Sequence, residues 1–132
     1  MANAEKAIDG VTTWAALEKA VRNFAHCDQG QASEMFNEAM LRVLIGGWPN
    51  VAEAEPLLEG NAAFKAWISK RLVNPAIHKD DIDSVRGLAK SSCPSGRARL
   101  CEYFKDAVDA NKPIVVPNTI EFVKPADPSP KK

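Results

Sequence analysis

The chain has 132 residues, of which 45% are hydrophobic and 26% charged, and its 17 basic and 17 acidic side chains cancel. This length fits one domain with a sizeable core, and the composition is that of an ordinary globular protein. No run of about eighteen apolar residues is present, so the sequence predicts no membrane span. The overall neutral charge, with only modest basic groups, does not indicate a nucleic-acid binder.

The charges are distributed unevenly along the chain. Residues 1–60 hold four Lys and Arg against nine Asp and Glu, whereas residues 61–132 hold thirteen against eight. Balances of −5 and +5 predict an acidic face and a basic face, which would steer a charged partner. Chance differences between solvated helix faces would give the same counts, so this alternative stays open.

Helical periodicity begins after Val11-Thr12-Thr13, where a threonine is the expected N-cap of a first helix that continues to Phe24. Asp28 is the expected cap of a second helix over 31–46. That helix has a continuous apolar stripe, and two consecutive glycines end it. A short third helix follows, from Asn50 to about residue 58.

The second half of the chain predicts three further helices. Asn61 is the expected cap of a fourth helix, which ends before Asn74 and the proline after it. Asp80 begins a fifth helix, since a carboxylate is favoured at a helix N-terminus. The sixth helix is expected to run from Pro94 to Asn111.

The predicted fold is all-α. Residues 1–112 are expected to form a compact bundle of five to six short antiparallel helices with short connections. The β-branched segment 113–123 predicts an extended clasp or hairpin, and the proline- and lysine-rich residues 124–132 predict a disordered tail.

Three cysteines, Cys27, Cys93 and Cys101, are the most informative residues of the chain. Their spacing lacks the paired ligands of a zinc site, and no glycine-rich phosphate loop is present, so the sequence predicts neither a metal nor a cofactor. If the sixth helix begins at Pro94, Cys101 lies roughly 10 Å along it, beyond the reach of about 7 Å that a disulfide allows. Two alternatives therefore stay open: a bridge from Cys27 to either of the other two cysteines, or three reduced, buried thiols.

The sequence also bears on compartment and catalysis. The first residues lack the apolar core of a secretory signal, which predicts a cytoplasmic protein, or a periplasmic one if a signal peptide has been removed from this chain. His26, Cys27 and Asp28 are adjacent, but helical neighbours point about 100° apart and do not form a relay. The other histidine, His78, follows Pro75 and could meet Cys93 only if the fold happened to bring the two together. A non-catalytic protein is therefore expected, with a small cysteine-dependent enzyme or thiol redox sensor as the alternative.

Acidic side chains indicate a partner surface. They are Glu34 and Glu38 on the second predicted helix, and Glu53, Glu55 and Glu59 on the third. Such residues would contact a basic partner protein with fast, salt-sensitive association, although a plain solvated surface has the same pattern.

Several landmarks over about residues 14–110 resemble those of small helical proteobacterial proteins that act as immunity (antitoxin) partners of interbacterial toxins. They are Cys27-Asp28-x-Gly30, Trp48 after the long helix, Asn61-Ala62-Ala63-Phe64, Cys93-Pro94 and Leu100-Cys101. The resemblance implies a protein without catalytic activity that inhibits a cognate toxin or effector by binding it. Neither the residues themselves nor the family resemblance indicates an oligomeric state.

Overall fold

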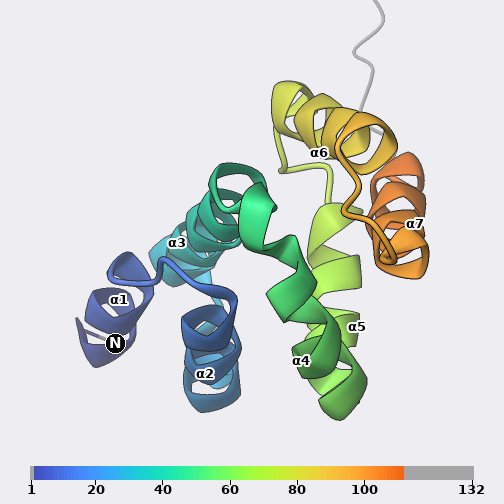
Figure 1. Cartoon of the computed structure of the whole chain (residues 1–132). Helices are drawn as coiled ribbons and strands as arrows, with labels where there is room; N and C mark the ends of the chain where they lie inside the picture. Colours follow the sequence, from blue (N-terminus) through green and yellow to red (C-terminus); the bar gives the residue numbers. More distant parts are fainter. Residues whose placement is uncertain (1, 112–132) are drawn as a thin grey trace, which may run out of the picture.

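The computed structural model describes residues 2–111, and every regular element within that range is a helix (Figure 1). The all-α fold class predicted from the sequence is confirmed. The described range holds seven α-helices instead of the expected five or six, because one helix precedes the first predicted one. The clasp predicted at 113–123 and the tail at 124–132 lie outside the described residues.

The α-helices are joined by short connections. In chain order they are α1 (Ala2–Asp9), α2 (Trp14–Phe24), α3 (Gly30–Leu41), α4 (Ala54–Gly60), α5 (Ala62–Leu72), α6 (Lys79–Ser91) and α7 (Ala98–Asp109). Two 3₁₀ segments, η1 (Ala25–Cys27) and η3 (Trp48–Glu53), and a π-helical segment, η2 (Arg42–Gly46), link them. Among residues 2–111, no helix meets the length and hydropathy requirements of a membrane-spanning segment.

Helices that are close in sequence also pack together. α1 lies against α2 and α3, α4 pairs with α5, and α6 packs along α7. Contacts of α2 with α4 and of α5 with α7 connect these groups. In Figure 1, α4 and α5 lie in the middle, between the first three helices and the α6–α7 pair.

An aromatic seam, formed by Trp14, Trp48 and Phe104, connects the two ends of the described chain. The ring centroid of Phe104 lies 5.8 Å from that of Trp14 and 6.2 Å from that of Trp48. All three side chains are buried. Because burying a large apolar side chain stabilises a fold by about 1.5 to 3 kcal/mol, the seam holds α2 and η3 firmly against α7.

Helix α1 is an addition to the predicted set, and packing explains it. Ala4 and Ile8 are each 1% exposed. The Arg42 guanidinium donates to the carbonyl oxygens of Ile8 at 3.2 Å and Val11 at 2.8 Å. Eight residues are too few for a helical period to stand out, and so short a helix depends on tertiary contacts rather than on its own propensity.

Two predicted N-caps are confirmed. The Thr13 hydroxyl oxygen accepts a hydrogen bond from the Ala16 N–H at 3.1 Å, and the Asn61 side-chain oxygen accepts one from the Phe64 N–H at 3.0 Å. Each satisfies a backbone donor that the first turn of a helix leaves without a partner.

The two glycines end the long helical stretch as predicted, and one of them does so for a steric reason. η2 ends at Gly46. A Cβ atom at Gly47 would lie 2.5 Å from the carbonyl oxygen of Val43, closer than any side chain tolerates. Glycine at this position lets the chain turn directly into η3 and places Trp48 in the seam.

Glu18 is a buried carboxylate between α2 and α5. It accepts hydrogen bonds from Arg22 Nε and Nη2, both at 3.1 Å, and from Asn61 Nδ2 at 2.8 Å. The Arg22 hydrogen bond is the largest influence. Together with the Asn61 hydrogen bond it keeps the pKa of Glu18 below its ordinary value of 4.5, although burial acts in the opposite direction. Asn61 therefore caps α5 and also stabilises the Glu18 charge.

Replacing Glu18 should change how stability depends on pH. Because its pKa is lower in the folded than in the unfolded state, ionised Glu18 stabilises the protein above the unfolded value. This contribution is lost as the pH falls through the folded value. We expect the free energy of unfolding to fall more steeply for the wild type than for Glu18→Gln between about pH 5 and pH 3, measured by denaturant unfolding. Glu38→Gln, on an exposed side chain, is the matched control; parallel curves for wild type and Glu18→Gln would contradict the assignment.

Candidate functional site

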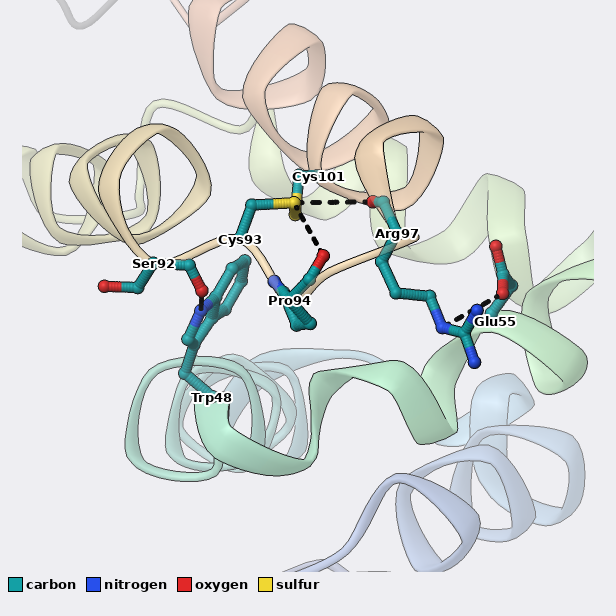
Figure 2. Close-up of a disulfide and its surroundings, with 7 residues drawn as sticks. All are labelled: Trp48, Glu55, Ser92, Cys93, Pro94, Arg97 and Cys101. Atoms are coloured by element: carbon teal, nitrogen blue, oxygen red, sulfur yellow. Dashed lines mark hydrogen bonds and ion pairs between the residues drawn. A yellow bond between two sulfur atoms is a disulfide. The ribbon is translucent and has the colours of Figure 1, made fainter.

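Cys93, in the connection that follows α6, forms a disulfide with Cys101 in α7 (Figure 2). Both alternatives drawn from the sequence are wrong, since Cys27 is a free and buried thiol and the other two cysteines are bridged to each other. The sequence-based exclusion of this pair assumed a helix starting at Pro94, whereas α7 starts at Ala98. Cys101 therefore lies in the first turn of α7, and the non-helical residues before it bring the chain back. The two Cα atoms are 6.0 Å apart, within the range of a disulfide.

The disulfide loop, residues 92–97, is also held from outside its own two helices. The indole Nε1 of Trp48 donates a hydrogen bond to the carbonyl oxygen of Ser92 at 2.8 Å. Figure 2 shows this bond at the start of the loop, next to the disulfide. The beginning of the loop is thereby attached to η3.

The end of the disulfide loop is attached to α4. Arg97 Nε lies 3.4 Å from Glu55 Oε1, and the two side chains are 41% and 28% exposed (Figure 2). Gly96, the preceding residue, has φ +78°, in the left-handed region that favours glycine. The loop thus reverses direction at Gly96 and is fixed at both ends.

A hollow of about 170 Å³ lies between α4, α5 and α7, and Glu55 in its wall pairs with Arg97 of the disulfide loop. We call it the α4–α7 hollow. Its walls combine apolar, acidic and basic side chains, namely Glu55, Leu58, Glu59, Lys65, Arg99, Leu100 and Tyr103. This volume is below the roughly 300 to 1,000 Å³ of typical small-molecule sites, so the hollow suits one side chain better than a cofactor.

Tyr103 is fixed in the wall of the hollow. Its hydroxyl donates to the Lys65 carbonyl oxygen at 2.6 Å and lies 2.8 Å from the Ser69 hydroxyl. Burial raises the pKa of Tyr103 above its ordinary value of 10.0, so the phenol is neutral at physiological pH. The Lys65 ammonium lies over the ring, 5.4 Å from its centroid.

The five acidic residues predicted to bind a partner lie in three places. Glu55 and Glu59 line the α4–α7 hollow. Glu53 lines a separate cavity of about 20 Å³, large enough for one water molecule. Glu34 and Glu38 are exposed on α3. The hollow is consequently of mixed charge, because Glu55 is paired and basic side chains share its walls.

The two histidines and the free thiol lie in three different places: a helix cap, an exposed turn and the core. His78 caps α6, where its Nδ1 accepts a hydrogen bond from the Asp80 N–H at 3.1 Å. His26 is exposed in η1, and Cys27 beside it is 5% exposed. Within residues 2–111, no three His, Cys, Asp or Glu side chains gather as metal ligands would.

Asp28 has a role that the sequence analysis missed. The expected cap is wrong, because α3 begins at Gly30 and Asp28 contacts α5 instead. Its carboxylate pairs with Arg71 and accepts a hydrogen bond from Trp67 Nε1 at 3.2 Å. Arg71 also donates to Asn37 Oδ1 at 2.6 Å. Asp28 and Arg71 are 43 positions apart, so no local pattern could have indicated this pair.

Comparisons of the chain with protein-family models, with curated proteins and with solved structures find no match.

The landmarks behind the family resemblance have structural roles. Asp28 binds Arg71, Trp48 binds the disulfide loop, and Asn61 caps α5. The remaining landmarks include a core phenylalanine and the two bridged cysteines. These residues stabilise the fold, so by themselves they do not identify a partner.

The disulfide should contribute measurably to stability. Removing it with Cys93→Ser and Cys101→Ser is expected to lower the free energy of unfolding by roughly 2 to 3 kcal/mol, as for a loop this short. Chemical denaturation measures the loss, and reduced wild type should match the double variant. Alkylation of the unfolded protein should label one cysteine without reductant and three after reduction. Three labels without reductant would contradict the pairing.

Proposed function

We propose that this chain is a non-catalytic binding protein that neutralises a bacterial toxin or effector by direct contact, as an immunity protein does. The observation that carries the proposal is the disulfide loop, fixed at both ends beside the α4–α7 hollow. The family resemblance of the sequence points the same way. The predicted closed, antiparallel helical body would serve as the rigid support of this surface.

A fixed loop supports binding for a thermodynamic reason. Trp48 holds one end of the loop and Glu55 the other, while the disulfide closes it. A segment that is already ordered loses little conformational entropy when a partner binds, so more of the contact energy becomes affinity. The size of the neighbouring hollow, suited to a side chain, fits a protein partner.

The disulfide also bears on the compartment. Disulfides persist in oxidising surroundings such as the bacterial periplasm, and are rare in a reducing cytosol. Bridging of Cys93 with Cys101 therefore favours the periplasmic alternative over the cytoplasmic expectation. A toxin neutralised there would be one that acts on, or passes through, the same space.

Growth rescue tests the proposed function. The product of the gene adjacent to this one, expressed alone in the same compartment, should stop cell growth, and co-expression of this chain should restore it. A stoichiometric complex of the two purified proteins should then form, because neutralisation is by binding. Continued growth arrest despite a soluble, folded chain would contradict the proposal for that partner.

The alternative, a thiol redox sensor or cysteine-dependent enzyme, has one observation in its favour, because Cys93 is only partly buried. The Cys93→Ser, Cys101→Ser variant serves as the control in the rescue experiment. A binding protein keeps its rescue at a temperature where the variant stays folded, with a weaker affinity because the loop is then held by Trp48 and Glu55 alone. A device that needs the thiols loses it.

The exposed glutamates of α3 are the predicted residues best placed for a basic partner. Glu34→Lys with Glu38→Lys should slow association with the partner about tenfold at low salt, and the effect should shrink as salt screens the charges. Glu5→Lys with Asp9→Lys, the same spacing on α1 and away from the disulfide loop, is the matched control. Stopped-flow association rates measure both; equal rates for the two variants would remove α3 from the interface.

A further inference from the structure

The charges around the α4–α7 hollow are not equally free to meet a partner. Glu55 is committed to Arg97, at 3.4 Å. Glu59, Lys65 and Arg99 are exposed, and none of them forms an ion pair within residues 2–111. The free charges of the hollow thus amount to one negative and two positive, although the sequence had indicated an acidic site at this position.

A cationic group of a partner would bind weakly in this hollow. The Lys65 ammonium already lies over the Tyr103 ring, where an incoming cation would otherwise bind. Such a cation would meet two like charges and only one free carboxylate. A single incoming carboxylate, by contrast, would find donors on Lys65 and Arg99. The neutral Tyr103 phenol adds no negative charge to oppose it.

The apolar part of the hollow indicates which residues flank the carboxylate that binds there. Leu58 and Leu100 are each 4% exposed and line the hollow together with the Tyr103 ring. Walls of this kind favour an acid whose neighbours are apolar, because apolar side chains of the partner can pack on them. Glu59 repels a second carboxylate, so a strongly acidic segment is disfavoured.

We propose that the α4–α7 hollow receives one acidic side chain of the protein partner, flanked by apolar residues and bound by Lys65 and Arg99. This inference rests on the proposed function and specifies the chemistry of the partner at that site. The acid enters between α4, α5 and α7, next to the disulfide loop, which gives the partner a fixed edge to contact.

Short peptides test the inference on the full chain without the partner. Acetyl-Leu-Glu-Leu-amide is the probe, and acetyl-Leu-Gln-Leu-amide has the same shape without the charge. In NMR titrations at low salt, the glutamate peptide should bind roughly fivefold more tightly, equivalent to about 1 kcal/mol. The shifts should centre on Leu58, Leu100 and Tyr103. Lys65→Gln with Arg99→Gln should abolish the difference between the peptides.

Two further variants sharpen the result. Lys70→Gln with Lys90→Gln, which removes two exposed cations elsewhere on α5 and α6, should leave binding unchanged. Glu59→Gln should strengthen binding of the glutamate peptide about twofold, because a like charge is removed.

Several outcomes of the peptide titrations overturn the inference. They are equal binding of the two peptides, shifts centred elsewhere, no binding of the glutamate peptide at millimolar concentration, and an unchanged affinity in the Lys65→Gln, Arg99→Gln variant. Tighter binding of acetyl-Leu-Leu-Leu with a free carboxyl group would overturn the assignment to a side chain and indicate a chain terminus. If the Lys65→Gln, Arg99→Gln variant rescued growth as well as the wild type, the proposed role of the hollow would be refuted. The proposed function would stand.

Discussion

The indole ring of Trp48 packs edge-on against Phe104, and its N–H group donates a hydrogen bond to the carbonyl oxygen of Ser92. These two contacts involve different parts of one buried side chain. The apolar contact fixes α7, and the polar contact fixes the beginning of the disulfide loop, both relative to η3. Gly47, which directly precedes Trp48, allows the sharp turn that directs the indole ring inward. The buried Trp48 side chain therefore positions the disulfide loop, which is part of the surface proposed for binding.

Local patterns in the sequence were sufficient to predict most of the helices. Caps such as Thr13 and Asn61 act within three residues, so their side chains and the backbone groups they satisfy appear together in the sequence. The error at Pro94 has the same origin. Proline is common at the first position of a helix, but Gly96, with its positive φ, reverses the chain two residues later and delays the helix.

Long-range polar contacts could not be predicted, because nothing local encodes them. Arg71 and Asp28 meet only after α5 has packed beside α3, and Arg97 meets Glu55 only after the disulfide loop has formed. For the same reason, the acidic cluster predicted around Glu55 turned out to be mixed. Counts of charge along the chain indicated two faces of opposite sign, whereas folding places basic residues of the second half beside acidic residues of the first. The candidate site is defined by these contacts, and so it became visible only in the folded chain.

The free thiol of Cys27 has a consequence for how the chain matures. During oxidation, three different sulfur pairings compete in the unfolded polypeptide. Cys93 and Cys101 are 8 positions apart, whereas Cys27 and Cys93 are separated by 66. Ring closure over the longer span costs about 2 kcal/mol more entropy, so the short ring forms first and most often. In the folded chain Cys27 is buried, so its thiol has little access to the Cys93–Cys101 disulfide for exchange.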